Sequence, residues 1–404
     1  MKKQARRDFI RKSIAGMAGI SVLPAGISSG QSMADTAREF ARPVSRVLGN
    51  TGLTIPVISV GAGSSQHPGF IRAAYDAGLK FFFTATYYGE GNNEKMLGDA
   101  VKEFGRDTFL VGTAVLPRGV DHKAGIYTSE STYDDMVKRA EDSLRRFGME
   151  YVDLMLLPYA ARRESVFFEP LLRAMEDLKK KGMARFIGIA THSSVAEAIR
   201  AAADTGVYDA AMVAYNFKNA HDVELQSAMD YVGAKGLGLI AMKTQAGAYW
   251  DKERTQPINS RATIKWALQN KNITTVVSGM STIDQLQQNI ALMQDLELTE
   301  QERIDLKLSG DQDVTGLYCR QCKQCLSQCP NRLDIPTIMR SYMYAYGYKD
   351  LALAHATLGM ALPAGGSCEG CGTCRVNCSM GFRISERVND IARLRTVPPE
   401  FLQA

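Results

Sequence analysis

Short apolar runs alternate with helical stretches through residues 45–295 of the chain. Eight of these runs have the continuous apolar character of strands that are buried on both faces of a parallel sheet. They span residues 56–61, 79–83, 108–113, 152–157, 185–189, 211–214, 237–241 and 273–277. The stretches between them carry helix signals. In one of them, Met136, Ala140 and Leu144 share a face, and Gly148 is suited to end the helix.

Eight strand–helix units in about 250 residues predict an α/β fold, a (β/α)8 TIM barrel. The alternative is a doubly wound open sheet, which needs a Gly-rich fingerprint after its first strand. Gly61-Ala62-Gly63 lacks the third glycine of that fingerprint. We therefore predict a TIM barrel at residues 45–295, with any ligand site at the C-terminal ends of its strands.

The composition is that of a globular protein, with 45% hydrophobic and 23% charged residues among 404. This length has room for two or three domains. The formal net charge of +5 arises within residues 1–34, which hold six basic residues and one acidic residue. The rest of the chain is therefore balanced, and no basic patch with interleaved aromatic residues points to a nucleic-acid partner.

The N-terminal segment begins with a basic head that contains Arg6-Arg7 and continues as an uncharged stretch from Ser13 to Ala34. Glycines and a proline interrupt this stretch, so it is too weakly apolar for a membrane span. The pattern predicts a twin-arginine signal peptide at residues 1–34. We expect export by the Tat translocase to the periplasm or another extracytoplasmic site, with a membrane tether if the signal is not cleaved. The alternative is a disordered basic arm.

Two cysteine runs near the C-terminus share the spacing C-x2-C-x2-C-x3-C and contain every cysteine of the chain. In such runs three thiolates bind one iron–sulfur cluster, and the fourth ligates the other cluster. We therefore predict two [4Fe–4S] clusters, one held by Cys319, Cys322, Cys325 and Cys378, the other by Cys368, Cys371, Cys374 and Cys329. Zinc sites and disulfides are the alternatives, but zinc ribbons use pairs of CxxC rather than triples. The runs define a small, mainly helical ferredoxin-type domain at residues 316–395, after a polar linker at 296–315.

Between residues 45 and 395 the chain resembles the aldo/keto reductases, in particular the branch with a C-terminal iron–sulfur domain. The resemblance depends on the order and spacing of several short motifs. These are Gly49-Asn-Thr-Gly52-Leu53, Tyr88-Gly89-x-Gly91-x-x-Glu94, Tyr151-Val-Asp153-Leu154, Ala214-Tyr215-Asn216 and Gly279-Met280-Ser281 with Asn289.

The resemblance implies a catalytic tyrosine that gives a proton to a substrate carbonyl while NADPH gives hydride. Tyr88 matches this residue. The family's supporting Asp, Lys and His positions are occupied here by Phe83, Ala114 and Pro158. Because burial raises the pKa of a tyrosine and a nearby cation must offset this effect, we expect weak NADPH-dependent carbonyl reduction.

The resemblance also implies nucleotide-binding positions. Tyr215 matches the residue that stacks on nicotinamide, and Gly279, Ser281 and Asn289 match the loop that holds the adenine end. No Lys or Arg lies between Lys271 and Arg303, so this loop offers no cation to a 2′-phosphate. A nicotinamide nucleotide is therefore a doubtful cofactor. The alternatives are a packing role for Tyr215 and a helix start for Gly279.

Polar residues that follow other strands could form a different site at the barrel mouth. They are His192, Lys243, Gln245, Arg118, Arg162 and Arg163. We weigh three functions: an exported oxidoreductase whose clusters exchange electrons with a small-molecule substrate or a redox partner protein, a non-catalytic scaffold for an electron relay, and a nicotinamide-dependent carbonyl reductase. A mouth with converging polar groups favours an enzyme, whereas a filled apolar mouth favours the scaffold.

Overall fold

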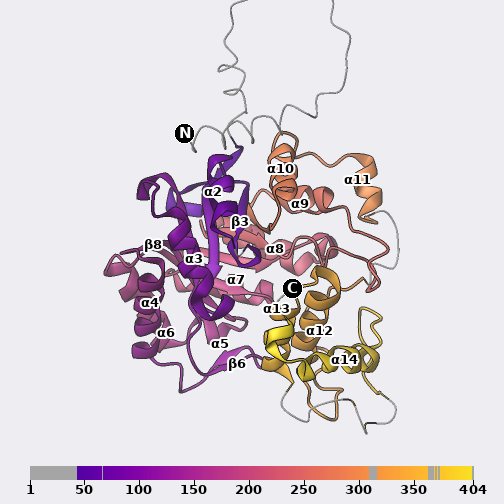
Figure 1. The fold of residues 1–404 in the computed structure, drawn as a ribbon. Helices are drawn as coiled ribbons and strands as arrows, with labels where there is room; N and C mark the ends of the chain where they lie inside the picture. The colour runs from indigo at the N-terminus through magenta and orange to yellow at the C-terminus, as the bar shows by residue number, and fades with distance from the viewer. Residues whose placement is uncertain are drawn as a thin grey trace, which may run out of the picture. The chain divides into compact units, whose positions relative to one another are not determined.

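Eight parallel strands close into a barrel in the computed structural model of the protein (Figure 1), which confirms the predicted TIM barrel. The structure describes residues 43–65, 67–308, 316–362, 368, 371 and 374–402, and the predicted signal peptide lies outside this part. In chain order the barrel strands are β3 (Ile58–Gly61), β4 (Phe81–Ala85), β5 (Leu110–Ala114), β8 (Val152–Pro158), β9 (Ala184–Thr191), β10 (Ala210–Ala214), β11 (Gly238–Met242) and β12 (Ile273–Gly279). β12 pairs with β3 and closes the ring. Each strand includes at least part of a run predicted from the sequence.

Helices surround the barrel and bury their apolar faces against it. They are α2 (Pro68–Asp76), α3 (Asn92–Val101), α4 (Tyr133–Phe147), α5 (Arg163–Val166), α6 (Glu169–Lys180), α7 (Val195–Thr205), α8 (Val223–Ala234), α9 (Ser260–Gln269) and α10 (Ile283–Leu292). In α4, Thr132 caps the first turn by accepting the Asp135 N–H, and Gly148 ends the helix with a φ of 66°. Within the described ranges, no helix combines the length and apolar character that crossing a bilayer requires.

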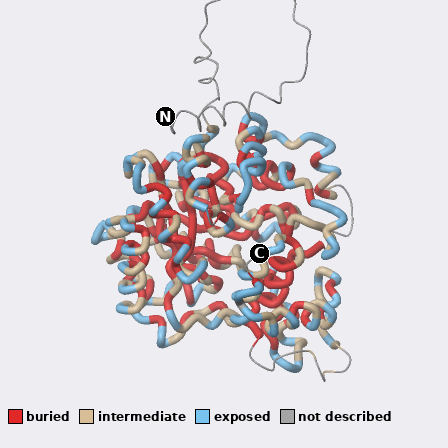
Figure 2. Tube along the Cα trace, in the orientation of Figure 1, coloured by how far each residue is buried: buried red, intermediate tan, exposed pale blue. Residues whose placement is uncertain are grey.

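Two small hairpins are added to the barrel. β1 (Ser45–Val47) and β2 (Thr54–Pro56) form the first, which brings Leu48 and Ile55 into the barrel interior. β6 (Val120–Asp121) and β7 (Ile126–Tyr127) form the second, after β5. The interior itself is apolar and includes Phe83 and Ala114, two of the positions where the resemblance places polar catalytic groups. Figure 2 shows the barrel strands as mostly buried.

Two acidic residues from the recognised motifs have structural roles. Asp153 in β8 accepts hydrogen bonds from Arg106, Arg185 and the Val111 N–H, each at 2.8 Å. Glu94 in α3 accepts from Thr113 and Ser143 and pairs with Arg146 at 2.6 Å. Both carboxylates are fully buried, and these partners offset the cost of burying their charge.

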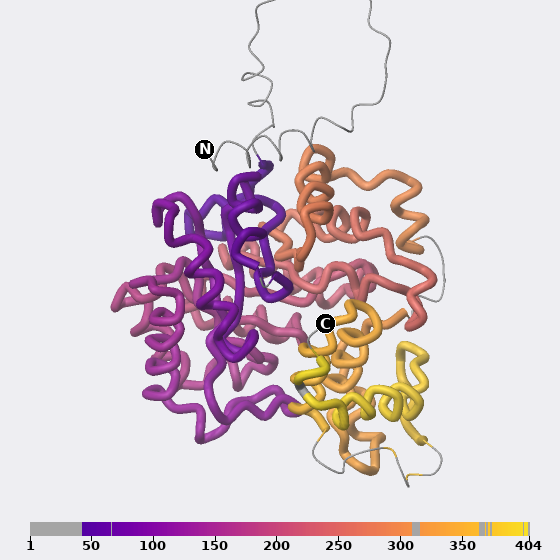
Figure 3. Tube along the Cα trace, viewed as in Figure 1, coloured from indigo at the N-terminus to yellow at the C-terminus, as the bar shows by residue number. Residues whose placement is uncertain are grey.

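The C-terminal region, residues 316–402, is mainly helical. It contains α12 (Ile335–Met343), the π-helix η6 (Tyr344–Tyr348), α13 (Leu351–Ala361), α14 (Ile384–Ala392) and the short 3-10 helices η7 (Arg393–Thr396) and η8 (Pro399–Phe401). Figure 3 shows the last segment of the chain beside the segment that carries α12, and α12 packs on both α13 and α14.

The predicted linker at residues 296–315 contains helix α11 (Glu300–Asp305), while residues 309–315 lie outside the described part. The buried Lys265 of α9 fastens this segment to the barrel. Its ammonium group pairs with Asp295 at 2.9 Å and with Glu302 at 3.1 Å.

The barrel and the C-terminal region share one hydrophobic core. Phe217, Ala246 and Ile258 of the barrel pack with a set of C-terminal residues that includes Leu317, Ile338, Met339 and Met343. The backbones approach most closely where Gly347 of η6 faces Gly247, and a Cβ atom at Gly347 would overlap the carbonyl oxygen of Gly247. The described residues from 43 to 402 accordingly belong to one compact unit.

We expect Gly347→Ala to destabilise the protein by about 1–3 kcal/mol, because the added methyl group pushes the C-terminal region away from the barrel. The free energy of unfolding of the iron-loaded protein, measured in denaturant, tests this. Gly359→Ala in α13 is the matched control, because its Cβ would meet no atom within 4 Å. The control should raise stability by up to about 1 kcal/mol. Equal changes in the free energy of unfolding for the two variants would show that the close contact between Gly347 and Gly247 is not needed for packing of the C-terminal region on the barrel.

Candidate active site at the barrel mouth

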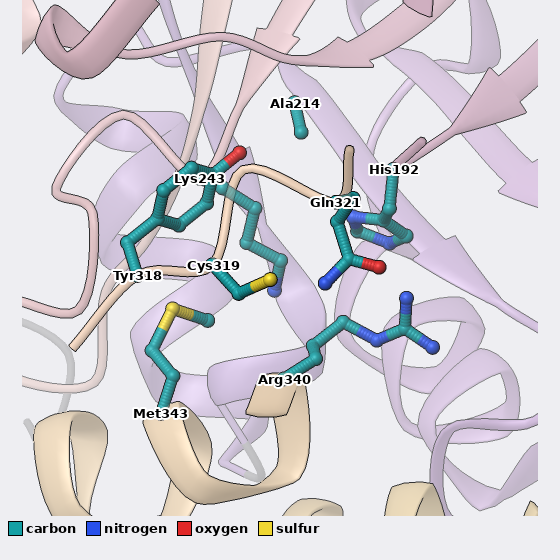
Figure 4. Close-up of a pocket in the computed structure, with 8 residues that line it drawn as sticks. All are labelled: His192, Ala214, Lys243, Tyr318, Cys319, Gln321, Arg340 and Met343. Atoms are coloured by element: carbon teal, nitrogen blue, oxygen red, sulfur yellow. The ribbon is translucent and has the colours of Figure 1, made fainter. Parts of the chain in front are cut away.

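A polar pocket lies at the C-terminal ends of the barrel strands, beneath the C-terminal region (Figure 4). The barrel contributes His192 after β9, Ala214 at the end of β10 and Lys243 after β11. The C-terminal region contributes the remaining lining residues, Tyr318, Cys319, Gln321, Arg340 and Met343. The pocket is narrow, with about 260 Å³ of space between its atoms when the part open to solvent is included.

Lys243 is held in this pocket by contacts on both sides. Its backbone has a φ of 60°, an uncommon value for a residue with a side chain. Asn216 stabilises this conformation by donating a hydrogen bond to the Lys243 carbonyl at 3.2 Å. The Lys243 ammonium lies 4.5 Å from the ring centre of Tyr344, in the C-terminal region. Burial lowers the pKa of Lys243, while the neighbouring Tyr88 acts in the opposite direction.

Tyr88 begins the helical turn η3 (Tyr88–Gly91), directly after β4. Its ring packs edge-on against Tyr87, with 5.0 Å between ring centres, and it also lies against Gly63. Burial raises the pKa of Tyr88 to about 12, and Lys243 is the neighbour that lowers it. The cation beside the tyrosine therefore comes from the end of β11, although position 114 in β5 is an alanine.

Arg340 is the second cation of the pocket. The residue is 9% exposed, and its guanidinium donates to the Thr337 hydroxyl at 3.4 Å. Among the described residues it forms no ion pair with a carboxylate. His192 lies nearby, and burial, followed by the charges of Arg340 and Lys243, moves the pKa of His192 well below its usual value. The imidazole is therefore neutral at pH 7.

A second pocket adjoins the first and shares His192, Gln321 and Arg340 with it. Its wall also includes His122, Lys323 and Asp334. Two buried atoms of this wall have no hydrogen-bond partner among the described residues, namely His122 Nδ1 and Asp334 Oδ2. Together the two pockets form a polar region that extends from the barrel into the C-terminal region.

The described cysteines fall into two sets. Burial raises the pKa of the Cys319 thiol to about 12, and the nearby thiols of Cys325, Cys322 and Cys378 raise it further. Burial likewise raises the pKa of Cys368 to about 11, with contributions from Cys374, Cys329 and Cys371. Each set contains three cysteines of one run and the fourth of the other, which is the donor arrangement that two crossed [4Fe–4S] clusters require.

Hydrogen bonds tie the two runs together. The Asn377 N–H donates to the Gln328 side chain at 2.7 Å, and the Cys322 sulfur lies 3.4 Å from the Ser379 hydroxyl. The Met380 N–H donates to the Cys378 sulfur at 3.4 Å, a contact that stabilises a thiolate. Among the described residues, no three His, Cys, Asp or Glu side chains are close enough to hold a single metal ion. The C-x2-C-x2-C-x3-C spacing of both runs is typical of iron–sulfur ligands, whereas zinc ribbons use pairs of CxxC.

The predicted nucleotide-binding residues are placed apart from the pocket. Tyr215 is buried in the layer between the barrel and its helices, with its ring 4.8 Å from that of Trp266. Its hydroxyl accepts a hydrogen bond from Gln226 at 2.9 Å. Tyr215 therefore has packing and hydrogen-bonding partners of its own and does not line the pocket.

Gly279, Ser281 and Asn289 lie together around the start of α10. Gly279 and Ser281 are exposed, and the Ser281 N–H donates to the Gln285 side chain at 2.8 Å. Asn289 is buried and donates to the Ser278 hydroxyl at 3.3 Å. An open loop before a helix N-terminus is thus present at the end of β12.

The remaining candidates behave differently from Lys243 and His192. Arg118, Arg162 and Arg163 pair with Asp135, Glu197 and Asp204 respectively. Neither these arginines nor Gln245 lines either pocket. Arg340 and Gln321 were missed by the sequence analysis. A signal for Arg340 was present, because it is the only charged residue within the apolar stretch Ile335–Met343, all of which is buried.

Comparison with known proteins agrees with this geometry. The aldo/keto reductase family model matches residues 65–263, and a 4Fe-4S dicluster domain model matches residues 318–383. L-galactose dehydrogenase from Arabidopsis thaliana is 26% identical over 62% of this chain and 88% of its own. D-threo-aldose 1-dehydrogenase from a Pseudomonas species is 28% identical over 40% of this chain and 57% of its own. An aldo-keto reductase from Klebsiella pneumoniae, solved in complex with NADPH, aligns with a TM-score of 0.51 and 21% identity, over 66% of this chain and 95% of its own.

The fold and its relatives define the protein as an oxidoreductase built on a TIM barrel with an iron–sulfur domain at its C-terminal end. Residues 65–263 thus match the aldo/keto reductase family, and a match to a 4Fe-4S dicluster domain follows at residues 318–383.

Proposed function

We propose that the protein is an exported iron–sulfur oxidoreductase whose small-molecule substrate binds in the mouth pocket. One observation carries the proposal. Cys319, a predicted cluster ligand, lines the same pocket as Lys243 and His192. Bound iron–sulfur clusters would supply single electrons, and a redox partner protein outside the cytoplasm would exchange electrons with the exposed side of the C-terminal region.

The character of the mouth supports an enzyme over a scaffold. Phe83 and Ala114 make the barrel interior apolar, but the space above it is lined by charged and polar side chains from both parts of the chain. Burying such groups is costly unless they are hydrogen-bonded or paired, and groups of this kind cluster at functional sites. The converging polar groups thus match the pattern that we expect of an active site.

Lys243 suits proton transfer in this site, and Tyr88 lies near it without lining either pocket. The pKa of Tyr88, raised to about 12 by burial, keeps the phenol protonated at neutral pH. Lys243, whose pKa burial lowers, gives up its proton more readily than a free lysine. Lys243 could therefore deliver a proton to a substrate that gains electrons in the pocket.

A nicotinamide-dependent carbonyl reductase is the competing function, and the open loop around Gly279 and Ser281 is the feature that favours it. Against it stand the packed position of Tyr215 and the apolar residues Phe83, Ala114 and Pro158 of the replaced catalytic set. The absence of Lys and Arg between 271 and 303 further disfavours a 2′-phosphate.

We expect poor or no oxidation of NADPH or NADH by the iron-loaded protein with a panel of aldehydes and ketones. Nucleotide binding, followed by fluorescence, accompanies the assay. Turnover of about 1 s⁻¹ or more, within the ordinary range of enzymes, would contradict the proposal and restore carbonyl reduction as the function. Tight nucleotide binding without turnover would indicate a nucleotide site that has lost hydride transfer. In the same anoxic samples, the reduced iron–sulfur clusters should be reoxidised by small electron acceptors that bind in the mouth pocket.

A further inference from the structure

Two cations, the buried Arg340 and the half-buried Lys243, line the mouth pocket without an acidic partner. Lys243 comes from the barrel and Arg340 from α12 of the C-terminal region, and both line the same small space (Figure 4). Elsewhere in the described chain, buried charges are paired, as Asp153, Glu94 and Lys265 show. The pocket is therefore unusual for this protein.

The nearby acids do not neutralise these cations. Asp350 caps α13 by accepting the Leu353 N–H at 2.9 Å, and Asp334 caps α12 by accepting the Thr337 N–H at 3.4 Å. Neither forms an ion pair with Lys243 or Arg340 among the described residues. Of the side chains that line the two adjoining pockets, Lys243, Lys323 and Arg340 are basic, and Asp334 alone is acidic.

Neither cation has a carboxylate partner among the described residues, and a bound anion would supply one. We infer that the mouth pocket binds a compact oxyanion, such as a small carboxylate, between Lys243 and Arg340 and beside Cys319. The inference deepens the proposed function and rests on it for the identification of this anion as the substrate.

The chemistry of the two cations fits this ligand. The planar guanidinium of Arg340 can donate two parallel hydrogen bonds to a carboxylate, whereas the Lys243 ammonium acts as a point charge. His192, neutral in this environment, can add a hydrogen-bond donor or acceptor. A single arginine from one region and a single lysine from the other also make the site complete only when barrel and C-terminal region are docked.

Calorimetry on the anoxic, iron-loaded protein tests the inference with three probes. Pyruvate represents small carboxylates, nitrate represents inorganic oxyanions, and pyruvamide is the neutral analogue of pyruvate. Pyruvate or nitrate should bind, and the one that binds more tightly shows whether the site prefers a carboxylate or an inorganic oxyanion. Pyruvamide should bind at least about tenfold more weakly than pyruvate if pyruvate is bound, because it lacks the charge.

Variants assign the binding to the two cations. Arg340→Gln and Lys243→Met should each weaken binding of the preferred anion at least about tenfold. The affinity of Arg340→Lys for the anion should lie between those of wild type and Arg340→Gln. Lysine keeps the positive charge but cannot donate two parallel hydrogen bonds. Arg162→Gln is the matched control, because Arg162 lies on the same side of the barrel but pairs with Glu197 at 3.5 Å. The affinity of this variant for the anion should equal that of wild type.

Stability separates a binding role from a structural one. Removing one of two like charges should leave the ligand-free protein as stable as wild type or more stable, with its iron content unchanged. A smaller loss of affinity in either variant, equal binding of pyruvamide and pyruvate, or failure of both anions to bind would overturn the inference. Anion binding without electron transfer from the reduced protein would instead leave this site standing and remove the proposed function.

Discussion

Cys378→Ala should remove about half of the iron and the acid-labile sulfide from the protein, which should fall from about eight of each per chain to about four. The reason is the crossed arrangement of the thiols. Cys378 belongs to the second cysteine run, yet its thiol lies near Cys319 and Cys325 of the first run. The group lost should therefore be the one that adjoins the mouth pocket.

Cys329→Ala is the matched control for this prediction. It should remove the same amount of iron but from the other set, because Cys329 lies near Cys368. The two variants can be told apart by electron paramagnetic resonance of the reduced proteins, recorded with and without an anion in the pocket. Cys329→Ala should keep a signal that responds to the anion, and Cys378→Ala should lose it. The reverse result would show that each run binds its own cluster.

Most of the barrel could be predicted because short segments of the sequence are enough to indicate its strands and helix ends. Strands such as β4 and β8 are buried along their whole length, so their apolar runs stand out in the sequence. The end of α4 was predictable for the same reason, since Gly148 supplies the left-handed conformation there. The hairpin of β6 and β7 was not predicted, because two-residue strands leave no periodicity to detect.

The mouth pocket could be predicted only in part. His192 and Lys243 follow barrel strands, and barrel geometry brings such residues to one face. Arg340 reaches the pocket because α12 docks over the mouth, and no local pattern encodes that packing. The same holds for Tyr215, whose motif suggested a stacking role, whereas the structure surrounds it with Trp266, Gln226 and Asn270. Resemblance placed these residues along the chain but could not give the direction of their side chains.

Replacing Arg6 and Arg7 together by Lys should keep the protein in the cytoplasm, folded and loaded with iron. This follows from the proposal that residues 1–34 are a twin-arginine signal, which is read by a translocase through the arginine pair rather than through charge alone. The double variant and the wild type carry the same charge in this segment, so a difference in export between them cannot arise from charge. Cell fractionation with an iron assay of each fraction measures the outcome.

If the protein is exported as proposed, the positions of its cysteines give a reason for crossing the membrane in the folded state. Cys325 is buried in the core that the C-terminal region shares with the barrel, and Cys319 lines the pocket between them. Iron–sulfur groups at these positions would have to be inserted before the two parts close around them, and an unfolded chain could not retain them. The Cys329→Ala, Cys378→Ala double variant tests this coupling, since impaired insertion should also reduce its export.

Export of the Arg6→Lys, Arg7→Lys variant at the wild-type level would refute the twin-arginine assignment while leaving the mouth pocket and its ligand chemistry unaffected.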